Sequence, residues 1–353
     1  MSGQDDRFQP GAAPEKHFSR PLAAVLVVAV LLLALVAWVF WLVVQRPMTV
    51  ERWATVAALK GAGLERATLD TTAGELAVWR GGPTGGGDPA ATAPTLVLLH
   101  GAGDHAGSWS AVAEALAPDH RLVIPDLPGH GDSEPGEGGL PMATVLGGVV
   151  DLLRAESAAT DGPAPVLVGN SLGGWLALLV GRAHPELVSR LVVVNGGAIP
   201  GPQDPDLLLP EDRDQARRIL DLVGAPGPLP DGVLDDLVRN LQSGALPRFM
   251  AADDHDDHDL TGRLGEVAVP VDLVWGELDR YLPLDYARAH LEALPAARLT
   301  VIEECGHVPL RYCPKRFIPL LRQVLASPPP APGDSTAATE GATAAAPEGD
   351  ATP

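Results

Sequence analysis

Apolar residues follow three different patterns along this chain of 353 residues. From residue 95 onward, short and fully apolar runs alternate with stretches in which apolar residues recur at helical spacing. Apolar strands that alternate with helices are typical of a parallel sheet covered by helices on both faces. Before them, residues 64–70 and 75–80 alternate between polar and apolar, which predicts two antiparallel strands joined by a turn at 72–74. The third pattern is one long apolar run at 22–44.

The alternating part of the chain predicts a sheet with an insertion. The expected strands span residues 95–99, 121–125, 166–168, 191–194, 271–275 and 299–302, and the expected helices span residues 108–116, 142–155, 172–183, 285–294 and 314–325. Residues 200–267 interrupt this order, because they contain no strand pattern and only short helical ones, at 212–223, 231–241 and 245–251. Since the segment falls between two sheet strands, we expect a helical cap over the carboxyl edge of the sheet, where open α/β folds bind ligands.

The ends of the chain have a different composition. Residues 1–21 are polar and residues 327–353 are rich in Pro, Ala, Thr and Glu, so both are expected to be disordered. The domain organisation is predicted as a polar N-terminus (1–21), a transmembrane helix (22–44), a mildly helical stem (45–63), a core in two parts (64–199 and 268–326) around the cap (200–267), and a tail (327–353).

The apolar run at 22–44 predicts a single-pass membrane anchor. At 1.5 Å per residue it reaches roughly 34 Å, enough to cross a bilayer core of about 30 Å. The apolar part of a cleavable signal peptide is usually shorter, about 7–15 residues, and no small-x-small cleavage site follows before residue 45. Basic residues flank both ends of the run, so the positive-inside rule leaves the orientation open. A chain that begins near Gly61 is expected to be soluble.

Ser171 is the candidate nucleophile. The strand expected at 166–168 ends in Gly169-Asn170-Ser171-Leu172-Gly173, and an apolar helical run follows at once. A serine at the apex of such a strand–turn–helix has a strained backbone, and its hydroxyl projects above the sheet. The helix N-terminus behind it favours negative charge that develops there. The alternative interpretation is a glycine-rich turn with an ordinary serine.

A serine hydroxyl reacts only with a base within hydrogen-bond reach and a group that orients this base. Of the ten histidines, His307 is best placed, on a loop after the last expected strand. The acid should lie between serine and histidine in chain order and follow a strand. Asp279 meets this condition, with Glu277 as its rival, and such an aspartate would hold the histidine tautomer.

Backbone amides are the expected donors for the oxyanion. Leu172 directly follows the candidate nucleophile, and Ala102 lies in the loop after the strand that ends at Leu99. His100 opens this loop and is expected to brace it rather than to take part in the reaction.

Charge and cysteine content narrow the function further. The formal net charge of −20, from 45 acidic and 25 basic residues, disfavours nucleic acids and anionic lipid as partners. The two cysteines form no zinc-binding spacing; Cys305 is expected to serve packing, and the sequence leaves open whether it bonds to Cys313. The run of Asp and His at 253–259 is expected to be a solvated acidic loop rather than a metal site, since seven consecutive side chains cannot all converge on one ion.

From about residue 64 to 326 the chain resembles the α/β-hydrolase superfamily. The matching motifs are HGAG at 100–103, DLPGHGDS at 126–133, GNSLGG at 169–174, WGELD at 275–279 and GHVP at 306–309. The resemblance implies an α/β-hydrolase fold, no cofactor and no metal, a triad and an oxyanion hole. Its residues here would be Ser171, Asp279 and His307, with Ala102 and Leu172 as oxyanion amides. The loop with Asp126, His130 and Asp132 would be mostly structural.

Two subgroups of this superfamily fit the sequence. The anchor, stem and small cap resemble membrane-anchored monoacylglycerol lipases, whereas the GNSLGG motif also resembles the carbon–carbon hydrolases of aromatic ring cleavage. We therefore expect a membrane-anchored serine hydrolase that cleaves carboxylic esters through an acyl-enzyme. Its partners would be a small-molecule or lipid ester such as a monoacylglycerol, and the bilayer through residues 22–44, but no nucleic acid. The alternatives are a carbon–carbon hydrolase and a non-catalytic membrane-bound binding protein.

Overall fold

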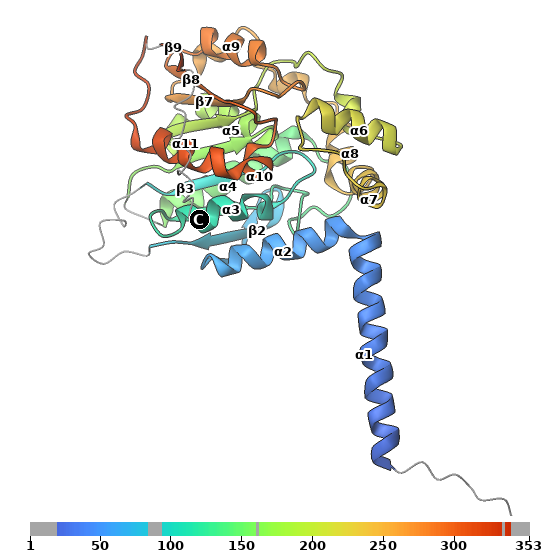
Figure 1. Cartoon of the computed structure of the whole chain (residues 1–353). Helices are drawn as coiled ribbons and strands as arrows, with labels where there is room; N and C mark the ends of the chain where they lie inside the picture. The colour runs from blue at the N-terminus through green and yellow to red at the C-terminus, as the bar shows by residue number, and fades with distance from the viewer. Residues whose placement is uncertain (1–19, 84–93, 160–161, 334–335, 340–353) are drawn as a thin grey trace, which may run out of the picture.

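The computed structural model describes residues 20–83, 94–159, 162–333 and 336–339. Figure 1 shows a long helix, α1 (Arg20–Gln45), that stands apart from an α/β body. Within the described residues, nine strands form one sheet in the order β1-β2-β4-β3-β5-β6-β7-β8-β9. Their bounds are β1 Glu65–Thr71, β2 Gly74–Gly81, β3 Leu96–Leu99, β4 Leu122–Pro125, β5 Val166–Asn170, β6 Arg190–Val194, β7 Val271–Gly276, β8 Ala297–Ile302 and β9 Thr336–Thr339.

The sheet has the expected mixture of strand directions. β1 and β2 form the predicted antiparallel hairpin, and β2 pairs antiparallel with β4. The strands from β4 to β9 run parallel to one another. All their carboxyl ends therefore lie at one edge of the sheet, which is where ligands bind in open α/β folds.

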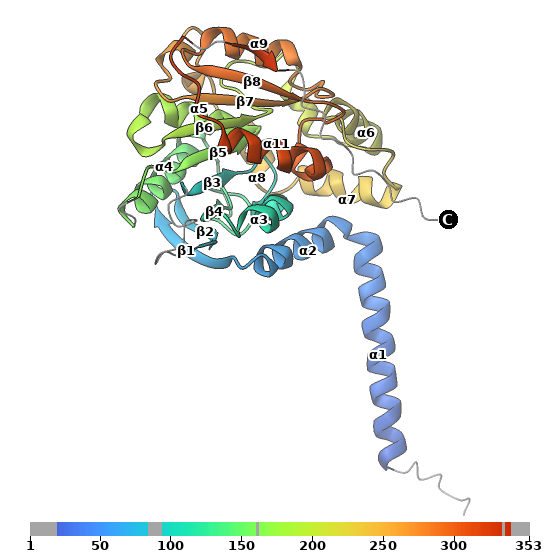
Figure 2. The ribbon, with the colours of Figure 1, turned by 60° about the vertical axis from the view of Figure 1, so that its left-hand side comes forward.

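Helices cover both faces of the sheet, as the largely apolar strands predict. One buried cluster joins the sheet to α4 (Met142–Ala158), α5 (Leu172–Ala183) and α9 (Leu284–Ala293). The other cluster joins the opposite face to α2 (Pro47–Gly61), α3 (Ser110–Leu116) and α11 (Pro314–Ala326). In β5 the side chain of Leu167 belongs to the first cluster, and those of Val166 and Val168 belong to the second. Figure 2 shows the sheet between these two layers.

The segment between β6 and β7 is helical and lies at the carboxyl edge of the sheet. It contains α6 (Arg213–Leu222), α7 (Asp231–Leu241) and α8 (Ala245–Met250), together with short 3-10 turns. Arg213 links α6 to α7 through Asp231 and Asp235, at 2.9 and 2.5 Å. Part of the acidic exterior of this cap is therefore neutralised by ion pairs between its own helices.

The segment expected to be a stem is a helix packed on the body. In α2 the Leu59 side chain is fully buried, and Glu51 forms an ion pair with Arg311 at 3.0 Å. Arg52 pairs with Asp132 at 2.5 Å. Segment 45–63 thus belongs to the domain structure rather than connecting it loosely to α1.

The structure tests the expected disorder of the two chain ends only in part. Residues 1–19 and 340–353 lie outside the described residues. Within the tail, the expectation of disorder over 327–353 is wrong at Thr336–Thr339, which form β9 and pair with β8. An edge strand has unpaired backbone groups, and these can order even a chain of low intrinsic preference.

Helix α1 is long and apolar enough to span a membrane by length and composition. Its segment Ala24–Gln45 has a mean hydropathy of 3.0, and only 6% of the window that defines it is buried. A signal sequence near an N-terminus passes the same test. This segment is not a buried core helix, because nearly all of its side chains are exposed.

Candidate active site

Ser171 lies at the turn between β5 and α5 in an unusual backbone conformation. Its φ is 53° and its ψ is −115°, a strained combination for a residue with a side chain. Glycine is required at 169 and 173, because backbone atoms of the strand and helix approach these positions too closely for a side chain. A Cβ on Gly169 would lie 2.1 Å from the carbonyl oxygen of Gly173, and one on Gly173 would lie 2.4 Å from that of Leu99. The sequence G-x-S-x-G thus folds into the tight elbow that it predicts.

The three candidate triad residues meet in hydrogen-bond contact. His307 Nε2 lies 2.9 Å from Ser171 Oγ, and His307 Nδ1 lies 2.7 Å from Asp279 Oδ2. The side chains of Asp279 and His307 are both buried. In a neutral His307 that donates from Nδ1 to Asp279, Nε2 is free to accept the Ser171 proton.

Asp279 is held by further donors, one of which sequence reasoning missed. The amide of Asn195 donates to Asp279 Oδ2 at 2.7 Å, and the Leu282 backbone N–H donates to Oδ1 at 2.8 Å. Asn195 also accepts the Gly276 N–H at 3.1 Å, and it is fully buried. Its signal in the sequence is a polar residue directly after the apolar run of β6 at 191–194.

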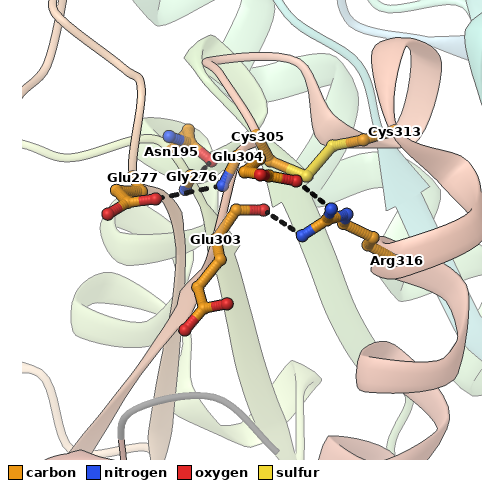
Figure 3. The surroundings of a disulfide bond; sticks show 8 residues. All are labelled: Asn195, Gly276, Glu277, Glu303, Glu304, Cys305, Cys313 and Arg316. Carbon is orange, nitrogen blue, oxygen red and sulfur yellow. Dashed lines mark hydrogen bonds and ion pairs between the residues drawn. A yellow bond between two sulfur atoms is a disulfide. The ribbon is translucent and has the colours of Figure 1, made fainter. Parts of the chain in front are cut away.

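The rival acid, Glu277, makes a different contact. Its Oε2 accepts the Glu304 backbone N–H at 3.0 Å, and Figure 3 shows it between the end of β7 and the loop before His307. Glu277 therefore supports this loop, and Asp279 alone of the two contacts the histidine ring.

A disulfide closes the loop that carries His307. Cys305 and Cys313 are bonded to each other, which answers the question that the sequence left open. The carbonyl of Cys305 accepts the Leu278 N–H at 2.7 Å, and Arg316 donates to the Glu303 carbonyl at 3.1 Å and pairs with Glu304 (Figure 3). The disulfide loop is thus joined to the loop of Asp279 on one side and to α11 on the other.

His307 is also fixed by its own backbone. Its N–H donates to Val223 O at the end of α6 at 2.7 Å. Its carbonyl accepts the side-chain amide of Asn170 at 2.9 Å. Asn170, next to the candidate nucleophile, therefore ties Ser171 and His307 together through a buried hydrogen bond.

Ala102 and Leu172 lie beside Ser171, where the oxyanion is expected. Both line the same cavity as Ser171. Leu172 is the first residue of α5, so its N–H has no acceptor within the helix. The loop of Ala102 approaches closely, since a Cβ on Gly101 would lie 3.2 Å from Ser171 Cβ. Their role as oxyanion donors stays a prediction.

His100 braces this loop, as expected. Its Nε2 accepts the Leu127 N–H at 2.9 Å, and its Nδ1 contacts the Gly101 carbonyl at 2.8 Å. Burial lowers the pKa of His100 to about 4, so the ring is neutral and can accept and donate in these two bonds. Asp126 is likewise structural, because it accepts the backbone N–H groups of Ala106 and Asp132.

A cavity of about 380 Å³ opens beside Ser171. Much of its wall is apolar, and the larger side chains come from the core and the cap: Trp175, Ile199, Leu208, Phe249, Met250 and Tyr286. Three carboxylates also line it, those of Asp206, Asp256 and Asp259, and the described residues around it include no Lys or Arg. The cavity can hold an apolar group, and its described wall offers no Lys or Arg to an anionic one.

The acidic segment 253–259 packs more closely than a solvated loop. Asp254 accepts the N–H groups of Met142 and Ala143 at the start of α4, both at 2.9 Å. The His255 ring lies 4.6 Å from that of Phe249 and 6.0 Å from that of Trp175, measured between centroids. The expectation of a fully solvated loop is therefore wrong, because these residues join the cap to α4 and α5. Among the described residues, no three His, Cys, Asp or Glu side chains gather as metal ligands would.

Comparison with known proteins gives one family. A family model described as "Alpha/beta hydrolase family" matches residues 96–320. An uncharacterised protein of Mycobacterium tuberculosis is 29% identical over 276 residues, which cover 70% of this chain and 80% of that protein. A 2-hydroxy-6-oxononadienedioate/2-hydroxy-6-oxononatrienedioate hydrolase of Cupriavidus pinatubonensis is 29% identical over 245 residues, 62% of this chain and 82% of that enzyme.

The solved structures that resemble this one share its fold. A crystal structure described as a membrane phospholipase A and a novel bacterial virulence factor superposes with a TM-score of 0.64 at 24% identity, over 86% of this chain and 100% of that one. The BphD hydrolase of Rhodococcus, which acts on 2-hydroxy-6-oxo-6-phenylhexa-2,4-dienoate, superposes with a TM-score of 0.59 at 24% identity, over 75% and 100%. At 24% identity, these similarities show a shared fold.

Proposed function

Because this chain belongs to the alpha/beta hydrolase family, we propose that it is a membrane-anchored serine hydrolase that cleaves neutral, lipid-derived carboxylic esters such as monoacylglycerols. The observation that carries the proposal is the contact of His307 with Ser171 on one side and Asp279 on the other. A nucleophile, a base and an orienting acid in one line are what acyl transfer requires.

The reaction follows from this geometry in two halves. Ser171 Oγ attacks the ester carbonyl carbon while His307 Nε2 takes its proton, and Asp279 stabilises the imidazolium that forms. The amides of Ala102 and Leu172 hold the oxyanion. His307 then gives the proton to the leaving alkoxide, and the alcohol departs from an acyl-enzyme. Water, deprotonated by His307, attacks the acyl carbon and releases the carboxylic acid and Ser171.

The lining of the cavity favours a neutral substrate. Asp206, Asp256 and Asp259 repel an anionic group, and the described wall supplies no Lys or Arg to bind one. The apolar part of the wall suits an acyl chain, since each buried methylene contributes about 0.8 kcal/mol. This chemistry disfavours acyl-CoA and phospholipid head groups.

The anchor is the second part of the proposal. The large apolar side chains of α1 from Val25 to Val44 are exposed, most of them by more than half, and so many apolar groups require an apolar surrounding. A single-pass membrane protein with its active site beside the bilayer would meet single-chain neutral lipids at high local concentration.

Carbon–carbon hydrolysis is the second candidate, because several relatives are named as dienedioate hydrolases at about 29% identity. Their named substrates are dicarboxylates, for which a site usually supplies cations. The acidic wall of this cavity favours the ester reaction over it.

Covalent labelling tests the nucleophile. A fluorophosphonate probe should modify the wild-type protein, and Ser171→Ala should abolish the labelling. Labelling that persists in this variant would identify another nucleophile, and a wild-type protein that reacts with no such probe would favour the non-catalytic alternative.

A series of substrates tests the proposed substrate class. With p-nitrophenyl esters, kcat/KM should rise from acetyl to medium-chain acyl groups, and monoacylglycerol should be preferred over acyl-CoA. A preference for acetate, or for a dienedioate over every ester, would contradict the lipid assignment and favour carbon–carbon hydrolysis.

A further inference from the structure

Helix α2 follows α1 with almost no linker. Only Arg46 separates Gln45, the last residue of α1, from Pro47, the first of α2. Backbone hydrogen bonds continue across this junction, from Arg46 N–H to Leu42 O at 2.8 Å and from Val50 N–H to Arg46 O at 3.1 Å. Both views show α2 running across the end of α1, along the side of the body from which α1 leaves (Figures 1 and 2). If α1 spans a bilayer, α2 must therefore begin at its surface.

The two faces of α2 differ in character. The inward face carries charged and apolar side chains, such as Glu51, Arg52 and Leu59, which pair or pack with the body. The exposed residues of the outward face between positions 50 and 58 are uncharged, and the exposed Lys60 follows near the C-terminal end of the helix, with its Nζ 6.0 Å from the centroid of the Trp79 ring. Residues at helical spacing form a stripe along this face. We call this set the outward stripe: Val50, Trp53, Ala54, Ala57 and Gly61. Trp53 is 53% exposed.

We propose that the outward stripe of α2 lies on the bilayer, as an interfacial helix that fixes how the hydrolase body is oriented on the membrane. This inference rests on the membrane anchor of the proposed function. A helix with an apolar face is suited to the boundary between head groups and acyl chains, tryptophan is enriched at that depth, and the long side chain of Lys60 can extend from it to the head groups. The stripe is small, but α1 holds it at high effective concentration beside the membrane, so even a weak affinity is sufficient.

The position of α2 matters for the active site because the cap is attached to it. Asp236 of α7 has a fully buried side chain, and its Oδ2 accepts the Met48 N–H at the start of α2 at 2.9 Å. Arg46 and Arg239 neutralise it at 3.6 and 3.1 Å. At the C-terminal end of α7, Leu241 lies against Gly103, next to the candidate oxyanion residue Ala102. An α2 that lies on the bilayer therefore holds the cap and the cavity mouth close to the lipid.

Site-directed spin labelling of the full chain tests the proposal. The two native cysteines are bonded to each other, so Ala57→Cys creates a single free thiol for a nitroxide label, and Ala54→Cys provides a second reporter. The matched control is Glu292→Cys at the exposed end of α9, on the side of the body far from α1 (Figure 1). Each protein is reconstituted in phosphatidylcholine vesicles, and collision rates with oxygen and with a water-soluble nickel chelate are measured.

We expect the labels at 54 and 57 to be several-fold more accessible to oxygen relative to the nickel chelate than the label at 292. Equal accessibility at 57 and 292 would overturn the proposal. Spin–spin broadening with protection from both reagents would overturn it in favour of a second copy of the chain on this face. Thermal melts that match the wild type show that each variant is folded.

Carbonate washing of the same vesicles separates this inference from the anchor. If the protein stays in the washed membrane while position 57 is aqueous, only the interfacial role of α2 fails. If the protein is released, the anchor fails.

Discussion

At the scale of single residues, the carboxylate of Asp279 is fixed by three donors. His307 and Asn195 both donate to Oδ2, and the Leu282 N–H donates to Oδ1. An acceptor with every oxygen in use has little freedom to rotate, so it holds the imidazole in one orientation. The same reasoning makes Asn195 a positioning residue rather than one that touches the substrate.

The first prediction compares the two acids. Asp279→Asn should lower kcat by roughly 10³-fold or more, because an amide no longer stabilises the imidazolium or its tautomer. Glu277→Gln should keep nearly wild-type kcat, since glutamine can still accept the Glu304 N–H. Steady-state kinetics with a soluble ester measure both. The reverse order of the two variants would transfer the acid role to Glu277.

The sequence predicted the triad residues of this site but not the residues that position them. Ser171, Asp279 and His307 each follow a strand in a recognisable motif and in a fixed chain order, and the structure brings them together. Asn170 and Asn195 act through contacts with residues up to 137 positions away. Such contacts depend on the three-dimensional path of the chain, which no local pattern contains.

Two buried histidines predict a dependence of stability on pH. Burial lowers the pKa of His100 to about 4 and that of His130 to about 3. In the unfolded chain both rings titrate near the ordinary value of about 6.5. Below that pH the unfolded chain takes up protons that the folded protein does not, so the free energy of unfolding falls as the pH falls.

We predict that the contribution of each ring is fully present above about pH 6.5 and decreases, with a slope that approaches about 1.4 kcal/mol per pH unit, toward pH 5. Urea unfolding of the wild type and of His130→Gln measures it. The variant should lose about one histidine's share of the slope. Identical slopes would show that His130 titrates alike in the folded and unfolded states.

At the scale of elements, the long periodic segments were predictable and the role of α2 was not. The helix expected at 172–183 is α5 with the same bounds, because an apolar run after a tight turn has one dominant pattern. Residues 45–63 were expected to be a stem because their helical pattern is weak. Their packing depends on residues far along the chain, such as Asp236 and Arg311.

This packing changes the expectation for shortened chains. A chain that begins at Arg46 keeps α2 and should fold as a soluble hydrolase. A chain that begins at Gly61 lacks Leu59, whose fully buried side chain alone contributes about 2–5 kcal/mol to the free energy of unfolding. In this chain Asp236 also loses the hydrogen bond from the Met48 N–H. We predict that the chain from Gly61 melts at a markedly lower temperature or aggregates. Equal melting temperatures of the two chains in circular dichroism would show that α2 is dispensable.

At the scale of the whole molecule, two parts with opposite surfaces are joined through a short hydrogen-bonded junction. The formal net charge of −20 favours a body that stays in water and away from anionic surfaces, whereas α1 is long and apolar enough to span a membrane. The sequence predicted the apolar helix from the run at 22–44, and the body from its pattern of strands and helices and from its motifs. The hydrogen bonds of Arg46 and the buried Asp236 form the junction between them, and neither residue has a compositional signal.

The disulfide between Cys305 and Cys313 bears on topology as well as on the geometry of His307. Cytosolic thiols are kept reduced by glutathione and thioredoxin, and disulfides persist on the oxidising side of a membrane. Basic residues flank the apolar run evenly and do not orient it, but a bonded cysteine pair can. For the proposed anchor, the hydrolase body would then face the oxidising side of the membrane, with the N-terminal end of α1 in the cytosol. Its lipid esters would come from the outer leaflet of that membrane or from outside the cell, rather than from the pool that intracellular enzymes supply.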